Sequence, residues 1–373
     1  MNNALYDISD RADAALAATV STTGVPGVVQ VESFSGANDA AKMSAALSYA
    51  AAQTRVPWLQ LPARVFNTGS NTYAAFTGMK IMGPGNPIGP MNEEISSGKP
   101  VPGKWQTTCG NGASSLIQAT SAVYDTNFSG ITFHGGSNSQ IFRSTVNTYA
   151  AEYNTLSFYG VKNAFGNISE KWLGTQFRFT GHWTAIATGA ELMTLGGSDA
   201  QLFMEGYLNA NGTGAGAGRY IVNLQTLSKT DVGYMYLTAE NDWGGVKVTG
   251  PVSSKLSFFG GAYEGRSQSV LATRPVIDLA GGSSYFYGPW LGQVSSAVGT
   301  VNGVIHQSGG VAYFYGGTYW RGSATDQAFP VLYQTGGVAQ FHGLPVSGTS
   351  EQIRIRWSTG TTNSYPTPSN GVF

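Results

Sequence analysis

Four short segments share the pattern that decides the fold class: Leu256-Ser-Phe-Phe-Gly260, Ser284-Tyr-Phe-Tyr-Gly288, Ala312-Tyr-Phe-Tyr-Gly316 and Ala339-Gln-Phe-His-Gly343. Their final glycines recur at a nearly constant interval. A second pattern keeps step with the first, in Pro275-Val-Ile-Asp-Leu-Ala-Gly-Gly282, Gly303-Val-Ile-His-Gln-Ser-Gly-Gly310 and Pro330-Val-Leu-Tyr-Gln-Thr-Gly-Gly337. Two motifs that hold one phase over several periods indicate a structural repeat.

Each repeat holds two or three short apolar segments punctuated by glycine, with no room for a helix. This is typical of a coil of a parallel β-helix, in which each coil lies about 4.8 Å above the last. A β-propeller is the alternative, but a blade usually takes about 40 residues or more. The sequence therefore predicts an all-β, right-handed parallel β-helix with a period of about 28. Coils over residues 58–345 would number about ten.

A helix is predicted before the first coil, over Asp39–Gln53. Met43, Ala46, Leu47 and Ala50 recur at helical spacing and predict one buried stripe. Such a capping helix would cover the open edge of the stack. A second short helix is predicted over Ser9–Thr22, as a docking or oligomer-contact element or, alternatively, a frayed end.

Three domain segments follow from these patterns. Residues 1–33 are interpreted as an N-terminal helix and attachment segment, and residues 34–348 as the β-helix. Residues 349–373 are interpreted as a C-terminal strand and tail, with Ile353, Ile355 and Trp357 facing inward and a contact to a neighbouring subunit.

Composition excludes several function classes. Only 11% of residues are charged, and 20 basic residues balance 20 acidic ones, so a nucleic-acid partner is not expected. Cys109 is the single cysteine, so neither an intrachain disulfide nor a cysteine zinc site is expected. The histidines lack ligand spacing, and we expect no metal and no cofactor. No signal peptide is indicated and no apolar run is long enough to span a bilayer, so synthesis in a cytoplasm without membrane insertion is expected.

The entry to the repeats carries a resemblance. Phe34-Ser-Gly-Ala-Asn-Asp-Ala-Ala-Lys-Met-Ser-Ala-Ala-Leu47, followed by Val56-Pro-Trp-Leu-Gln-Leu-Pro62, resembles the start of pectate-lyase-like β-helix proteins. In that superfamily a Gly-Ala-x-Asp turn precedes a capping helix and a strand ending in proline. The chain departs from the pattern at Ala63–Phe66, where a Gly-Thr-Tyr turn is usual, and it lacks a second acidic residue beside Asp39.

Within that superfamily the chain is most similar to phage tailspikes. The resemblance implies a homotrimer in the virion tail or baseplate that recognises a host-surface polysaccharide. Attachment to other tail proteins would use the N-terminal segment. The resemblance also implies that clustered carboxylates on the central coils could make the chain an endo-acting glycoside hydrolase.

Glu240, Asp242 and Glu264 are the candidate catalytic residues. Aligning residues 231–243 with residues 255–264 puts Glu240 and Glu264 in one column, about 5 Å apart on adjacent coils. Asp242 lies two residues beyond Glu240, on the same face of a strand. Such spacing suits glycoside hydrolysis by a pair of carboxyl groups. Alternatively, these are solvated surface carboxylates.

A second column consists of Asp278, His306 and Tyr333, at identical positions in successive coils. The Asp–His pair could act as acid and base, or it could form a structural hydrogen-bonded ladder along the rod.

Aromatic residues near turns are candidates for sugar contact, with two arginines for acidic groups. These substrate-binding candidates are Trp243, Tyr263, Trp290, Trp320, Arg266 and Arg321, accompanied by Tyr319. Alternatively, the aromatic residues form a trimer interface or pack the turns. Three functions therefore stay open: a depolymerising spike, a purely adhesive spike, and a structural tail or baseplate fibre without a ligand.

Overall fold

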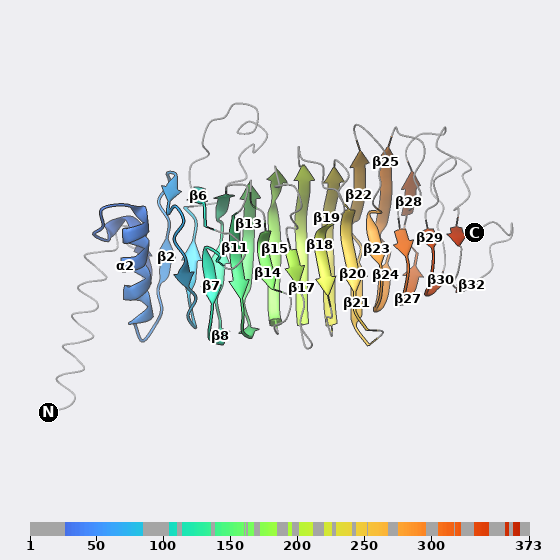
Figure 1. Cartoon of the computed structure of the whole chain (residues 1–373), viewed down its shortest axis with the longest axis horizontal. Helices are drawn as coiled ribbons and strands as arrows, with labels where there is room; N and C mark the ends of the chain where they lie inside the picture. The colour runs from blue at the N-terminus through green and yellow to red at the C-terminus, as the bar shows by residue number, and fades with distance from the viewer. Residues whose placement is uncertain are drawn as a thin grey trace.

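The computed structural model is a rod of stacked parallel strands with the α-helix α2 at its N-terminal end (Figure 1). It describes residues 27–84, 104–109, 114–135, 139–159, 161, 163–167, 172–184, 193–195, 201–211, 220–225, 229–240, 244–251, 253–267, 275–295, 305–316, 318–321, 332–342, 355–357 and 361–365. Every strand pairing among these residues that joins two coils is parallel, from the β1–β2 pair to the β30–β32 pair. The chain is therefore a parallel β-solenoid, as the repeat predicts.

One sheet of the solenoid has eleven strands, which stack in sequence order. They are β4 (Tyr73–Ala74), β7 (Ile117–Ala119), β11 (Gln140–Ser144), β14 (Asn163–Asn167), β16 (Met193–Leu195), β18 (Tyr220–Gln225), β20 (Gly244–Thr249), β23 (Ile277–Leu279), β26 (Ile305–Gln307), β29 (Leu332–Gln334) and β31 (Ile355–Trp357).

The remaining strands form a second sheet of 21 strands that closes the coils. They are β1 (Val28–Gln30), β2 (Trp58–Gln60), β3 (Phe66–Asn67), β5 (Lys80–Met82), β6 (Lys104–Thr107), β8 (Val123–Tyr124), β9 (Asn127–Ser129), β10 (Thr132–Gly135), β12 (Thr148–Tyr149), β13 (Glu152–Tyr159), β15 (Trp172–Thr184), β17 (Gln201–Asn211), β19 (Lys229–Glu240), β21 (Lys255–Phe259), β22 (Ala262–Ser267), β24 (Ser283–Tyr287), β25 (Trp290–Ser295), β27 (Val311–Tyr315), β28 (Thr318–Arg321), β30 (Val338–His342) and β32 (Thr361–Tyr365).

The coil count differs from the ten predicted, since the smaller sheet alone stacks eleven strands. The eleventh strand, β31, lies beyond residue 345, where the prediction ended the coils. Coil length also varies along the rod. Phe142 pairs with Phe165, whereas Val246 pairs with Ile277, so the second of these coils contains several more residues than the first. A uniform period holds only where the two sequence motifs recur.

The helix predicted over Asp39–Gln53 is found as α2 (Asp39–Ala51), preceded by the 3-10 turn η1 (Val31–Ser33). Asn38 caps its N-terminus by accepting a hydrogen bond from the backbone N–H of Ala41 at 2.9 Å. The apolar stripe formed by Met43, Ala46, Leu47 and Ala50 is buried, as predicted. The second helix, predicted over Ser9–Thr22, lies outside the described residues.

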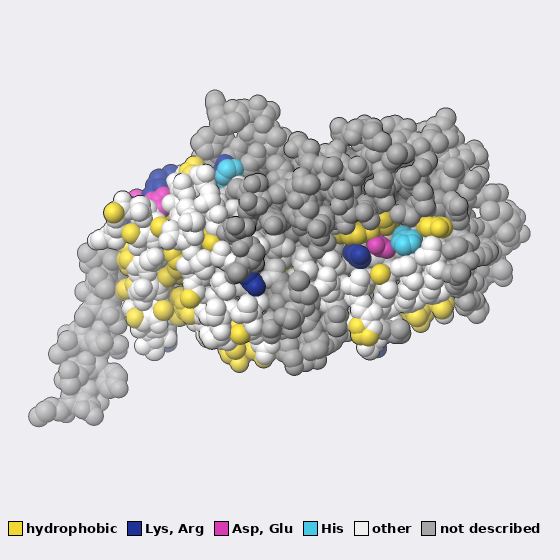
Figure 2. Space-filling view, in the orientation of Figure 1, with side chains coloured by type: hydrophobic (Ala, Val, Ile, Leu, Met, Phe, Trp, Pro, Cys, Tyr) yellow, Lys and Arg dark blue, Asp and Glu magenta, His cyan; other side chains and the backbone are white. Residues whose placement is uncertain are grey.

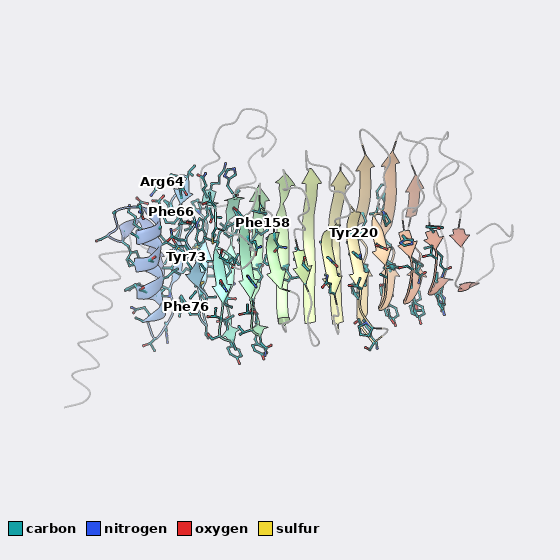
Figure 3. The ribbon with its side chains drawn as sticks, in the orientation of Figure 1. Arg64, Phe66, Tyr73, Phe76, Phe158 and Tyr220 are labelled. Atoms are coloured by element: carbon teal, nitrogen blue, oxygen red, sulfur yellow. The ribbon has the colours of Figure 1, made fainter. Side chains whose placement is uncertain are left out.

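Arg64 ties α2 to the first coils, beside Phe66 in Figure 3. Its guanidinium donates to both carboxylate oxygens of Asp39, at 2.9 and 2.6 Å, and to Glu32 at 2.6 Å. The side-chain hydrogen bond from Arg64 outweighs partial burial and holds the pKa of Asp39 below its usual value. Arg64 thus stands where the resemblance expected a Gly-Thr-Tyr turn, and it fixes the cap electrostatically.

Columns of aromatic rings fill the interior of the rod. In the C-terminal half Phe258, Phe286 and Phe314 are fully buried, with ring centroids 4.6 and 4.8 Å apart and nearly parallel planes. In the N-terminal half Phe133 stacks on Phe158 at 5.5 Å. Each ring covers the face of the next, so removing one ring leaves the faces of its two neighbours without a packing partner.

Paired glycines make the turn between β23 and β24 and its equivalents in the next two coils. The second glycine of each pair has a positive φ, +71° at Gly282, +70° at Gly310 and +78° at Gly337. The first approaches the coil below so closely that a Cβ at Gly336 would lie 2.5 Å from the carbonyl oxygen of Ser308. Only glycine allows both this contact and that backbone conformation.

Strands also lie in the two terminal segments. β1 pairs with β2, and β31 and β32 pair with β29 and β30. Residues 355–357 and 361–365 therefore continue the stacking of their own chain, while the predicted subunit contact of residues 349–373 stays a prediction. No described helix has the length and apolar character needed to cross a membrane.

Candidate functional site

The predicted carboxylate column is not formed. Glu240 ends β19 and Glu264 lies in β22, but Glu240 pairs with Arg266, and Glu264 pairs with Thr238. The register of the two strands is therefore shifted by two positions from the one that a shared column needs. The two glutamates are diagonal neighbours on one face, about 8 Å apart by backbone position. Asp242 and both glutamate side chains lie outside the described part of the chain.

The substrate-binding role predicted for Tyr263 is wrong. Its side chain is fully buried in the core, and burial raises the pKa of its hydroxyl, which has no hydrogen-bond partner among the described residues. It packs edge-on against Phe258 at 5.9 Å. A residue in the interior of the rod cannot contact a glycan.

The other aromatic and arginine candidates are placed by strand register. Trp290 is half-buried at the start of β25. Trp320 lies in the same column as Glu264, because Glu264 pairs with Gly292 and Gly292 pairs with Trp320. Arg266 and Arg321 do not share a column. Arg321 pairs with Gln293, and Gln293 pairs with Gly265, so the column of Arg321 is one residue away from Arg266. The side chains of Trp320, Arg266 and Arg321, and the whole of Trp243, lie outside the described set.

The column of Asp278, His306 and Tyr333 is confirmed. Asp278 in β23 pairs with His306 in β26, which pairs with Tyr333 in β29. His306 Nδ1 lies 2.9 Å from Asp278 Oδ1, and the His306 ring stacks on Tyr333 with centroids 5.6 Å apart. The equal spacing of the motif brings these side chains together.

Three further residues join this column, and sequence reasoning did not select them. Tyr220, labelled in Figure 3, donates from its hydroxyl to Asp278 Oδ2 at 2.6 Å. Lys247 pairs with Asp278 from the coil below, and its Nζ lies 5.5 Å from the centre of the Tyr220 ring. Thr335 Oγ1 lies 3.2 Å from His306 Nε2. Thr335 belongs to the last copy of the second motif, so the repeat itself was the signal that could have found it.

Asp278 is ionised in this setting. Burial alone would raise the pKa of its carboxyl, but hydrogen bonds from His306 and Tyr220 and the charge of Lys247 hold the pKa below its usual value. Figure 2 shows basic, acidic and histidine side chains next to one another on the near face of the rod. The column is therefore a polar, partly accessible strip on the smaller sheet.

A second surface, here called the tyrosine face, lies on the outer side of β21, β24, β27 and β30. It consists of Phe259, Tyr285, Tyr287, Tyr313, Tyr315 and His342. Alternation along each strand turns these residues outward while the phenylalanines between them face the core. Phe259, Tyr287 and Tyr315 are 46%, 39% and 37% exposed. Figure 2 shows hydrophobic side chains along this lower edge of the C-terminal half.

The rings of the tyrosine face stack in two parallel columns. Tyr285 lies 4.8 Å from Tyr313, and Tyr287 lies 5.1 Å from Tyr315, with planes within 7° of parallel. Partial burial and the neighbouring phenols raise the pKa of Tyr315. The Tyr-Phe-Tyr repeat thus encodes an ordered, exposed array of phenol groups.

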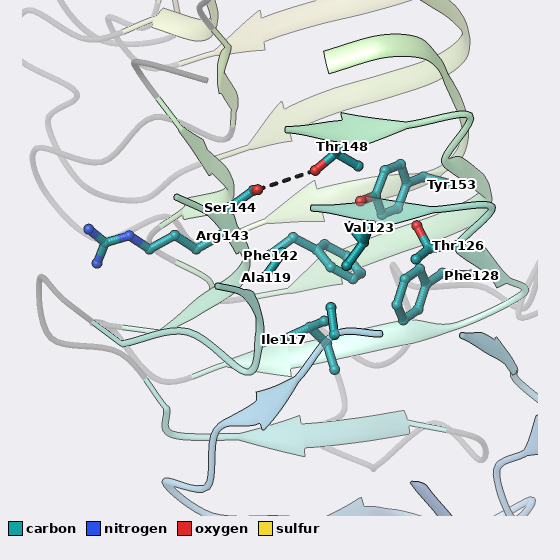
Figure 4. A pocket seen from close by; sticks show the side chains of 11 residues that line it. Ile117, Ala119, Val123, Thr126, Phe128, Phe142, Arg143, Ser144, Thr148 and Tyr153 are labelled. Atoms are coloured by element: carbon teal, nitrogen blue, oxygen red, sulfur yellow. Dashed lines mark hydrogen bonds between the residues drawn. The ribbon is translucent and has the colours of Figure 1, made fainter. Parts of the chain in front are cut away.

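An interior cavity of about 20 Å³ lies between the sheets near β11 and β13 (Figure 4). Phe128, Phe142 and Tyr153 line it, and Thr148 donates to Ser144 at 3.2 Å on its rim. It is large enough for a water molecule and far smaller than a ligand pocket. Among the described residues, no group of three or more His, Cys, Asp and Glu side chains could hold a metal ion.

No protein-family model, curated protein or solved structure matches this chain.

Proposed function

We propose that the chain binds a host-surface polysaccharide along its flank, as a viral tail spike or receptor-binding fibre does. The observation that carries the proposal is the tyrosine face, which stacks an outward ring on each of four successive coils and repeats a pair of tyrosines on the two central ones, β24 and β27. A linear polymer also repeats one unit along its length, so the equivalent tyrosines of β24 and β27 can make equivalent contacts with successive sugars.

The chemistry of the tyrosine face suits a sugar. Phenol hydroxyls donate and accept hydrogen bonds, and the exposed ring edges carry partial positive charge that favours hydroxyl oxygens. Stacking holds Tyr287 and Tyr315 in fixed positions, so little side-chain freedom is lost when a ligand binds. The low charge of the chain favours a weakly charged glycan.

Assembly and location form part of the same proposal. The chain acts as a homotrimer in the virion tail or baseplate, and residues 1–33 attach it to other tail proteins. The native mass of the purified full chain tests the trimer.

Binding of the full chain to a panel of bacterial capsular and O-antigen polysaccharides, measured by biolayer interferometry, tests recognition. We expect Tyr287→Ala/Tyr315→Ala to weaken binding at least about tenfold, because two central aromatic contacts are removed. The matched control is Tyr124→Ala/Tyr149→Ala, which removes another stacked pair, 4.7 Å apart, whose Tyr124 is 50% exposed. The control should bind like the unaltered chain.

Two results would overturn the proposal. One is equal binding by both double variants. The other is dissociation of a native oligomer by the tyrosine-face variant alone, because the face would then be a subunit contact.

Cleavage of the bound glycan is a second candidate function, favoured by the register of β19 and β22. Arg266 pairs with Glu240 in the strand register, and Thr238 pairs with Glu264, so the two glutamates have different sequence neighbours on the adjacent coil. The two glutamates are diagonal neighbours by backbone register, and a pair of carboxyl groups on adjacent coils is the arrangement that glycoside hydrolysis uses. Glu240 would act as base and Glu264 as acid.

A reducing-end assay tests this second candidate. Release of new reducing ends by the full chain, lost in Glu264→Gln with binding retained, would support it. A chain that binds and releases nothing would be an adhesive spike.

A further inference from the structure

A hydrogen-bonded relay crosses three coils on the smaller sheet, away from the tyrosine face. Asp278 Oδ1 lies 2.9 Å from His306 Nδ1, and His306 Nε2 lies 3.2 Å from Thr335 Oγ1. Tyr220 donates to the second oxygen of Asp278 at 2.6 Å. A carboxylate, an imidazole and a hydroxyl are thus joined in order, with each ring nitrogen of His306 facing a different partner.

The protonation pattern of the relay follows from the charge on Asp278. An ionised carboxylate only accepts hydrogen bonds, so Nδ1 of His306 carries the proton in that bond. In neutral His306, Nε2 is then left as an acceptor facing the Thr335 hydroxyl. The same hydroxyl also lies 3.3 Å from the carbonyl oxygen of Gln307, which is a second acceptor for its hydrogen.

The relay is accessible at the end where chemistry would take place. The side chain of Asp278 is 11% exposed and that of His306 is 20% exposed. Thr335 is half-buried and is followed by Gly336 and Gly337, which present no side chain beside its hydroxyl. A planar carbonyl group could therefore approach Thr335 Oγ1 at the turn.

We propose that Asp278, His306 and Thr335 form a hydrolytic triad that cleaves short-chain carboxylic esters, such as the O-acyl groups of a polysaccharide. Thr335 Oγ1 is the nucleophile and His306 is the general base. Asp278 and Tyr220 are positioning residues that hold the imidazole in its tautomer and orientation. The site lies on a different sheet face from the tyrosine face, so its activity does not depend on that surface.

The reaction takes place in two balanced steps. Thr335 Oγ1 bonds to the acyl carbon, its proton passes to His306 Nε2, and the ester C–O bond breaks as that proton is given to the departing alcohol. Water then attacks the acyl-threonine, losing a proton to His306, and the bond to Thr335 Oγ1 breaks as the hydroxyl regains a proton. The sum is ester plus water giving carboxylic acid plus alcohol.

Hydrolysis of 4-nitrophenyl acetate by the full chain tests the proposal. We expect release of nitrophenol above the buffer rate, and a rate at least about 100-fold lower in Thr335→Val and His306→Ala. The matched control is Ser308→Ala, because Ser308 has the same turn position one coil earlier and lies outside the relay. That variant should keep the full rate.

Trapping of the acyl intermediate decides the case if a variant fails to fold. Acid quenching and peptide mass analysis of the unaltered chain should place one acetyl group on the peptide that contains Thr335. Acetyl found only elsewhere, or an unchanged rate in a folded Thr335→Val, would overturn the triad and leave the relay as a structural ladder. Polysaccharide binding by Thr335→Val should stay intact, so failure of the triad and failure of the binding proposal are distinguishable.

Discussion

Replacing Phe286 by alanine measures how much the interior ring column stabilises the rod. Phe286 is fully buried between Phe258 and Phe314, at 4.6 and 4.8 Å. Truncating a core phenylalanine to alanine costs about 3–5 kcal/mol. Each stacked pair adds about 0.5–1.5 kcal/mol beyond burial, and two pairs are lost here. We therefore expect Phe286→Ala to lower the free energy of unfolding by about 4–5 kcal/mol, the upper half of the range for a core phenylalanine.

Tyr287→Ala is the matched control, because Tyr287 is the next residue of β24 and also stacks on two rings, Phe259 at 5.2 Å and Tyr315 at 5.1 Å. It is 39% exposed, so its truncation should cost only about 1–2 kcal/mol. Urea unfolding of the full chain, followed by circular dichroism and tryptophan fluorescence, gives both values if the two signals change together.

Equal losses in the two variants would refute the reasoning. The rod would then derive its stability at this coil from ring stacking alone, with no contribution from burial. A loss below about 2 kcal/mol for Phe286→Ala would show that the coil collapses readily around the missing ring.

Three further changes have expected outcomes. Arg64→Ala should lower the free energy of unfolding at neutral pH by about 1 kcal/mol and make it decline less in acid. Its partners Glu32 and Asp39 have lowered pKa values, so they stabilise the fold above their unfolded pKa, and this stabilisation is lost as pH falls. Melting temperatures across pH 2–7 check this, and an unchanged acid slope would contradict it. Tyr220→Phe should cost about 1.5–3 kcal/mol at neutral pH and raise the pKa of Asp278 toward its usual value. Less stability is then lost as pH falls, and the loss is complete at a higher pH. Carboxyl NMR titration checks the pKa, and an unchanged value would contradict the prediction. Gly336→Ala should destabilise the chain far more than Gly316→Ala. A Cβ at Gly336 would lie 2.5 Å from a carbonyl oxygen, whereas a Cβ at Gly316 would meet no atom and only the φ of +66° disfavours alanine there. Similar melting temperatures for the two variants would contradict this.

Where the motifs recur, the sequence predicted structure down to single contacts. Equal motif positions in successive repeats must pair when coils stack, so the Asp278–His306 contact followed directly from the period. The alternation in Tyr-Phe-Tyr likewise predicts which rings face the core. The helix α2 was predictable for a similar reason, because its buried stripe is a local periodic signal.

Where the motifs are absent, only the tertiary structure decided the outcome. No glycine pattern marks the coil that contains Glu240, and a register two positions away from the expected one moved Glu264 away from it and beside Thr238. Tyr263 was placed near a turn by its position after glycine, yet it points into the core because side chains alternate along β22. A shift of one residue reverses the face of a strand side chain, and a shift of two changes its partner.

The relay shows the same division at the level of chemistry. The repeat determined that Asp278 and His306 are neighbours. Tyr220 comes from a coil without the motif, and Thr335 comes from a turn whose conformation depends on glycines packed against the coil below. Sequence period alone specifies which strand positions stack, whereas the direction of a side chain at a turn depends on backbone contacts between coils that are made only in the folded rod.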